Sequence, residues 1–234
     1  MTDFGGTVYA FDANGAPVWT RSLNGSIATG PAVRDVTGDE QPEVTVATRQ
    51  ATVGHLTALG ADGTTVWRQE TEGLPGGVTT TDDRGRPVLL VGEGSGTVAA
   101  YDATDGERLW EAVLQDSPLR VGDASEGRIL LGGDGKMWAL DLGDGNVAWN
   151  QGFGGDNDAV TEPDLGPAGQ ESSEVLIAAR DGTVGLVSVA TGGVDSVGTR
   201  TGVSRPIRAR QISLVTTGRN SSSSVLTARS SYSA

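Results

Sequence analysis

An acidic stretch in the first third of the chain has the residue types of a site for a hard cation. Asp35, Thr37, Asp39, Gln41 and Glu43 place an oxygen-bearing side chain at every second position. A calcium ion takes several oxygen ligands from a loop that curls around it, and backbone carbonyls supply some of them. These residues are therefore candidate calcium ligands, four through their side chains and Gln41 through its carbonyl, although our preferred expectation is a protein without a cofactor. The alternative is a solvated acidic turn between two strands.

The residue types give little support for catalysis. His55 is the only histidine, and cysteine is absent, which excludes disulfides, thiol catalysis and cysteine-based zinc sites. No G-x-S-x-G motif accompanies the histidine, and the glycines match neither the phosphate-binding loop nor the dinucleotide fingerprint. We therefore assign no catalytic or cofactor-binding residue and do not expect an enzyme. His55 occupies a repeat position with exposed-type residues in the other copies, so we expect it at the surface.

The charge balance limits the classes of partner that the protein can bind. The formal net charge of −13 argues against nucleic-acid binding, which needs a basic footprint. Lys136 is the only lysine, and an acidic surface almost without lysine is typical of a high-salt cytoplasm; a GC-rich genome is the alternative. No run resembles a membrane-spanning helix or a signal peptide. We expect a monomeric, cytoplasmic protein without membrane insertion, or an extracytoplasmic one if the chain is a fragment of a longer exported protein.

One unit repeats along the chain and must position these residues. Residues 96–110 alternate as a strand, turn at Asp105-Gly106 and return as a second strand that ends at a tryptophan. Further copies lie at residues 5–19, 53–67, 135–149 and 181–196. The closing positions are Trp19, Trp67, Trp110, Trp149 and Ser196, spaced by 39 to 48 residues. That period is typical of four-stranded propeller blades.

The intervals between copies supply the remaining strands. Each interval holds two strand candidates, at residues 27–33 and 43–48, 77–81 and 87–91, 119–123 and 128–131, and 158–163 and 174–179. The first copy has no such pair ahead of it, whereas the candidates at 212–217 and 224–228 have no hairpin after them. We therefore predict one all-β domain over residues 1–234. It is a β-propeller of about five four-stranded blades, whose closing blade is shared between N- and C-terminal strands. The alternative is an open segment of a larger ring.

The repeats resemble a known family. Residues 100–110 and 139–149 match A-x-D-x-x-x-G-x-x-x-W, the tryptophan-docking pattern of pyrroloquinoline quinone (PQQ)-type repeats. The first copy is one residue short, the second has Gly60 in place of the aspartate, and the fifth has Ser188 and Ser196. The family includes quinoprotein alcohol dehydrogenases and the lipoprotein scaffold of outer-membrane protein assembly. Those enzymes hold PQQ over calcium, many beside a vicinal disulfide that this chain cannot form, so we do not expect PQQ as a cofactor.

The acidic stretch carries a second resemblance. Residues 35–43 are similar to the D-x-D-x-D-G-x-x-D calcium loop of integrin-type (FG-GAP) propeller repeats, with Thr37, Glu40 and Glu43 as departures. We expect the four tryptophans to be structural wedges between blades, with a quinone or ligand stack as the alternative. The resulting hypothesis is a non-enzymatic binding or scaffold module that presents loops at one face to a protein or small ligand. A calcium-binding adhesion-type repeat protein and a PQQ-dependent dehydrogenase fragment are the alternatives.

Overall fold

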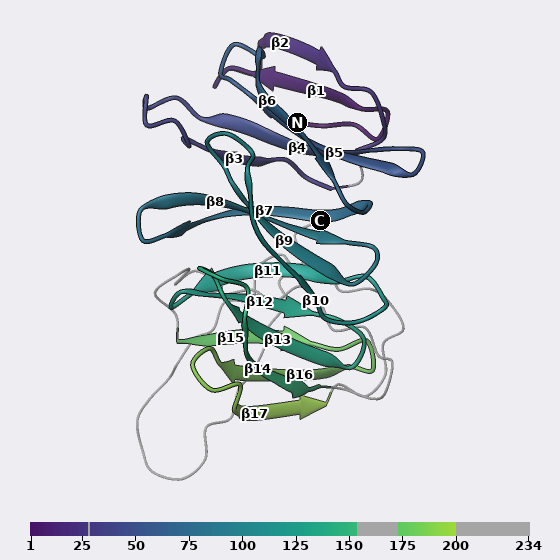
Figure 1. Ribbon diagram of the computed structural model, residues 1–234, viewed down its shortest axis with the longest axis vertical. Coiled ribbons are helices and arrows are strands. Elements are labelled where there is room, and N and C mark those ends of the chain that lie inside the picture. Colours follow the sequence, from purple (N-terminus) through teal and green to yellow (C-terminus); the bar gives the residue numbers. More distant parts are fainter. Residues whose placement is uncertain (28, 154–172, 200–234) are drawn as a thin grey trace. The chain divides into compact units, whose positions relative to one another are not determined.

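Strands make up the whole regular structure of the described residues. The computed structural model describes residues 1–27, 29–153 and 173–199, which all belong to one compact unit spanning Met1–Arg200 (Figure 1). These residues form 17 strands in five antiparallel sheets and contain no helix. Consistently, none of them forms a helix that could span a membrane. The prediction of an all-β propeller fold is confirmed.

The five sheets follow one another along the chain, and we number them as blades 1 to 5. Blade 1 comprises β1 (Thr7–Phe11) and β2 (Pro17–Ser22). Blade 2 comprises β3 (Ala32–Arg34), β4 (Glu43–Gln50), β5 (Val53–Leu59) and β6 (Thr65–Thr71). Blade 3 comprises β7 (Pro75–Asp83), β8 (Arg86–Glu93), β9 (Thr97–Asp102) and β10 (Arg108–Val113). Blade 4 comprises β11 (Arg120–Ser125), β12 (Arg128–Gly132), β13 (Lys136–Asp141) and β14 (Val147–Gly152). Blade 5 comprises β15 (Glu174–Ala178), β16 (Thr183–Ser188) and β17 (Val194–Thr199).

The repeated unit forms the outer hairpin of every blade. In blade 3 the hairpin β9–β10 pairs Trp110 with Ala100, and the register shifts between Arg108 and Trp110. Gly106 adopts a φ of 80°, which glycine reaches at little steric cost, and so it closes the turn. The corresponding strands pair in the same order in the other four blades. The predicted upstream pairs are present in blades 2, 3 and 4, but the first strand of blade 2 is shorter than the predicted 27–33 and comprises Ala32–Arg34. The candidate at 158–163 lies outside the described residues.

The beginning of blade 1 differs from its sequence interpretation in one detail. Thr2 forms a bridge with Val8, and the Tyr9 N–H donates to the Met1 carbonyl at 2.8 Å. Met1 and Thr2 therefore lie where the end of β8 lies in blade 3, beside the third strand of the blade. The pattern did not predict this pairing, because two residues are too few to show strand alternation.

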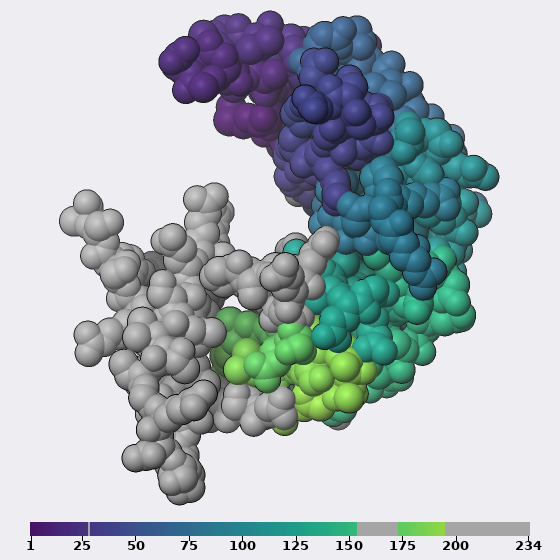
Figure 2. Space-filling view, turned by 90° about the vertical axis from the view of Figure 1, so that its left-hand side faces the viewer, coloured from purple at the N-terminus to yellow at the C-terminus, as the bar shows by residue number. Residues whose placement is uncertain are grey.

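The core is divided among the seams between successive blades. Val8 of blade 1 packs with Ile27, Val46 and Leu59 of blade 2. Larger clusters join blade 2 to blade 3, blade 3 to blade 4, and blade 4 to blade 5. Both faces of a middle strand are therefore buried: Leu89 and Val91 face blade 2, whereas Val88 and Leu90 face blade 4. Figure 2 accordingly shows each described blade in contact with the next one along the chain, as the sequence of colours indicates.

The predicted closure of the ring depends on strands near the C-terminus. The predicted closing strands at 212–217 and 224–228 lie outside the described residues. Closure through a shared blade and the single-domain assignment over residues 1–234 therefore stay predictions.

Candidate functional site

The four repeat tryptophans lie at the four described seams. Each indole N–H donates to a backbone carbonyl of the next blade, and each ring covers the turn glycine of that blade. The acceptors are Ala61 for Trp19 (2.7 Å), Ala103 for Trp67 (2.9 Å), Leu142 for Trp110 (2.8 Å) and Val189 for Trp149 (2.8 Å). The glycines beneath them are Gly63, Gly106, Gly145 and Gly192. Both the polar and the apolar part of each indole therefore join adjacent blades.

The motif aspartates stabilise the hairpin turns. Asp12 Oδ1 accepts hydrogen bonds from the backbone N–H groups of Asn14 and Ala16 at 2.9 and 2.8 Å. These N–H groups, the Ala16 one foremost, lower the pKa of Asp12. In the second copy Gly60 replaces the aspartate. Asp62 accepts from the Thr64 N–H at 2.9 Å, the bond that the equivalent Asp105 and Asp144 accept from Glu107 and Asn146. The aspartates therefore serve the turn, and the second copy keeps only the later of the two positions.

The acidic stretch forms a curled loop whose oxygens already accept hydrogen bonds within it. Asp35 accepts from the N–H groups of Gly38 and Glu40 at 2.7 and 2.9 Å, and Asp39 accepts from Gln41 at 2.9 Å. Glu43, at the start of β4, is buried and accepts from the Val36 N–H and the Thr37 hydroxyl. Among the described residues, no group of three histidine or acidic side chains has the arrangement of a metal site. Calcium binding by this loop stays a prediction, and it would require the ion to replace these hydrogen bonds.

His55 lies in β5, opposite Thr48 of β4 and Glu70 of β6. Its side chain is half-buried, and Nδ1 has no hydrogen-bond partner, so it is less accessible than the repeat pattern predicts. Burial, aided by the charge of Arg68, lowers its pKa. In the part of the chain that the structure describes, Nδ1 is thus not paired with a nucleophile.

An apolar hollow of about 280 Å³ lies beside blade 1. It is lined by residues of blades 1 and 2, among them Tyr9, Phe11, Trp19 and Val33. The Tyr9 and Phe11 rings are stacked with centroids 6.5 Å apart, and Phe11 is 46% exposed. In blade 3 the positions equivalent to Ala10 and Phe11 are fully buried beneath four strands, whereas two strands are described in blade 1.

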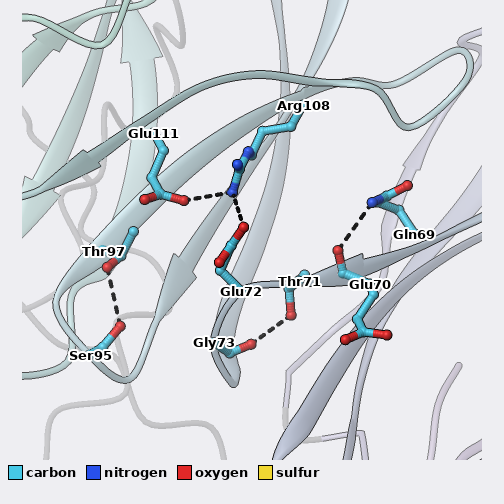
Figure 3. A network of polar contacts seen from close by, with 9 residues as sticks. All are labelled: Gln69, Glu70, Thr71, Glu72, Gly73, Ser95, Thr97, Arg108 and Glu111. Carbon is cyan, nitrogen blue, oxygen red and sulfur yellow. Dashed lines mark hydrogen bonds and ion pairs between the residues drawn. The ribbon is translucent and has the colours of Figure 1, made fainter.

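A polar pocket of about 340 Å³ lies at the seam between blades 2 and 3. Gln69, Glu70 and Glu72 line it from the side of β6, and Tyr101 and Arg108 from blade 3. Arg108 Nη1 donates to Glu72 at 3.0 Å and to Glu111 at 2.8 Å, as Figure 3 shows. The sequence interpretation did not identify this pocket, because its residues come from three strands and a loop that become neighbours only when the two blades pack.

A buried carboxyl group adjoins this pocket. Glu93, at the end of β8, is 2% exposed, and its Oε1 has no hydrogen-bond partner. Burial raises the pKa of Glu93, the Gly73 N–H lowers it, and the charges of Glu111 and Glu72 raise it further. Burial, together with the charge of Glu93, also raises the pKa of Tyr101 to about 12.

Comparison with known proteins places these blades in a family. A likeness to the crystal structure of BamB from Moraxella catarrhalis has a TM-score of 0.65 at 20% identity, and covers 84% of this chain and 60% of that chain. This chain therefore spans about 60% of the length of that relative, and 1004 solved chains match the fold, so the likeness shows the fold alone. No curated protein sequence matches significantly. The family model described as outer membrane protein assembly factor BamB matches residues 52–232, and the chain belongs to this family of PQQ-type repeat propellers.

Proposed function

We propose that the protein is a non-enzymatic propeller scaffold that binds a protein partner through loops or strand edges of its blades. The observation that carries the proposal is the use of the tryptophans. All four indole N–H groups donate to the next blade, and all four rings cover a glycine, so these side chains are engaged in holding blades together. A rigid stack of blades is a platform for binding, and the family description, an assembly factor, concerns a protein that acts on other proteins.

Photo-crosslinking of the full chain tests the proposal. A photoreactive phenylalanine analogue replaces Val113 in blade 3 or Val147 in blade 4, two valines that are 68% and 45% exposed. We expect a discrete adduct with one protein from at least one position, and binding of that protein after both are purified. The absence of a discrete adduct at these and further exposed positions would count against the scaffold. Robust dye reduction after addition of PQQ and calcium would replace the scaffold with the dehydrogenase.

Calcium binding by the loop at 35–43 is a second proposal, favoured by the curl of the loop. Gly38 and Glu40 both adopt positive φ angles, and the chain bends around the Asp35 carboxylate. Calorimetry should show calcium binding with a dissociation constant of about 10⁻⁴–10⁻³ M, typical of weak calcium modules. Asp39→Ala should abolish the heat, and Glu107→Ala, an exposed acidic residue of blade 3, should leave it unchanged. A heat that survives Asp39→Ala would rule out this loop as the site.

A further inference from the structure

The pocket between blades 2 and 3 has a surplus of carboxyl groups. Arg108 is the cation that lines it, and its guanidinium is shared between Glu72 and Glu111. Glu93 adds a third carboxyl group in the same electrostatic environment, since Glu111, Glu72 and Arg108 all act on its pKa. Glu70 also lines the pocket, so four carboxyl groups lie around one positive charge.

The Glu93 side chain lies on the face of blade 3 that packs against blade 2. Side chains of β8 alternate between the two faces of the blade, and Leu89 and Val91 pack against blade 2. Glu93 follows in the same alternation, on the face that carries Tyr101. A buried polar atom without a hydrogen-bond partner costs free energy, so the fold retains here an acceptor that an incoming donor would satisfy.

Glu93 does not itself line the pocket, and its Oε1 is buried, so a ligand reaches this oxygen only if nearby side chains move. Glu72 and Arg108 are 66% and 40% exposed, and both are long and unbranched. A side chain at Gly73 would collide with Glu93 Oε2, so the backbone lies directly against the carboxyl group on that side. The exposed Glu72–Arg108 pair, and not the Gly73 backbone, is therefore the part of the surroundings that can move aside for a ligand.

The chemistry of the pocket selects an organic cation. A metal ion needs several oxygens around one point, and the described residues contain no such group of acidic or histidine side chains. An ammonium or guanidinium group instead donates several directed hydrogen bonds, pairs with carboxylates and lies favourably against an aromatic ring. We propose that this pocket binds a protonated amine or guanidinium group, which donates to Glu93 Oε1 and to the Glu72 carboxylate.

The volume limits the size of the ligand and leaves two sources for it. About 340 Å³ is at the small end for ligand pockets and suits one long side chain or a small free amine. A free amine would serve as well as an arginine or lysine side chain of a protein. The inference therefore does not depend on the scaffold function, and it can fail or succeed separately.

Calorimetric titration of the full chain with matched probes tests the inference. The probes are agmatine as a free guanidinium, the blocked peptide acetyl-Gly-Arg-Gly-amide as a protein-like one, and the same peptide with uncharged citrulline in place of arginine. We expect at least one of the first two to bind and the citrulline peptide to bind at least tenfold more weakly. Binding of agmatine alone would identify a free amine as the ligand, and binding of the peptide would identify a protein side chain.

Variants connect the binding to the named carboxyl groups. Glu93→Gln should weaken binding of the cation by about tenfold or more, because the amide oxygen still accepts a hydrogen bond but the negative charge that strengthens this bond is gone. Glu72→Gln, at an exposed position that cannot disturb the core, should weaken it in the same direction. Glu126→Gln in the turn between β11 and β12 is the matched control and should bind normally. No binding of either cation, equal binding of the citrulline peptide, or unchanged affinity in both Glu93→Gln and Glu72→Gln would overturn the inference.

Discussion

Blade 3 and blade 1 contain the same hairpin, but its residues are buried to different depths. In blade 3, β7 and β8 lie beside the hairpin, and Ala100 and Tyr101 are 0% and 1% exposed. In blade 1, Met1 and Thr2 are the described residues that pair with β1 on the side away from β2, and Phe11 is 46% exposed at the position of Tyr101. The motif therefore determines the turn and the placement of the tryptophan, whereas the adjoining strands determine how deeply the motif is buried.

Truncation of the tryptophans should show the largest difference between the two blades. Trp110→Ala removes an indole that is 9% exposed and leaves a cavity at the seam of blades 3 and 4, so we expect a loss of about 3–5 kcal/mol in the free energy of unfolding. Trp19 is only half-buried, and Trp19→Ala should cost about 1–2 kcal/mol. Urea denaturation followed by circular dichroism measures both. Equal losses would mean that burial does not govern the contribution of the motif.

The turn glycines offer a sharper pair, because both have nearly the same backbone conformation. Gly145 and Gly15 have φ angles of 74° and 81°, so alanine costs about 1–2 kcal/mol in backbone strain at either site. A Cβ at Gly145 would also lie 2.5 Å from Trp110 Cε3, whereas nothing lies within 4 Å of one at Gly15.

Gly145→Ala should therefore be less stable than Gly15→Ala by about a further 1–3 kcal/mol, the usual cost of overpacking. The same urea titrations give the difference. Matching values for the two variants would show that Trp110 can shift away from Gly145 without loss.

The smallest expected effect concerns the pH dependence of stability. Asp3 and Glu93 lie at equivalent turns of blades 1 and 3, and they should contribute pH trends of opposite sign. The two turns contain the same backbone hydrogen bond. The Gly6 N–H donates to the Asp3 carbonyl at 3.4 Å, and the Gly96 N–H donates to the Glu93 carbonyl at 3.2 Å. The Thr7 N–H lowers the pKa of Asp3, whereas burial raises the pKa of Glu93.

A raised carboxyl pKa means that the folded protein binds the proton more tightly than the unfolded one. The contribution of Glu93 is therefore fully present below its unfolded pKa and decreases as pH rises through its folded pKa. The contribution of Asp3 is present above its unfolded pKa and is lost as pH falls through its lowered folded pKa. Glu93→Gln should remove the first trend and Asp3→Asn the second, measured as urea midpoints between pH 3 and 8. Parallel changes in the two variants would contradict this assignment.

The repeat pattern predicted local structure well because each hairpin carries its own signals. Strand alternation, the Asp-Gly turn and the terminal tryptophan lie within one copy, so the outer hairpins and most upstream strands could be predicted from sequence. The pocket could not, since Glu72, Tyr101 and Arg108 approach one another only through packing of two blades. Glu93 did carry a signal: a carboxyl group at the end of an apolar strand is buried with it, unlike Asp3 at the equivalent turn.

Hydrogen exchange of the four indole N–H groups tests the central claim most directly. Each N–H donates to the next blade, and the cover provided by neighbouring strands should determine how long the proton is retained. Nuclear magnetic resonance should show slow exchange for Trp67 and Trp110, faster exchange for Trp19, and no change on addition of PQQ and calcium. Fast exchange at all four tryptophans, or quinone-induced protection of any of them, would contradict the assignment of these residues as links between blades.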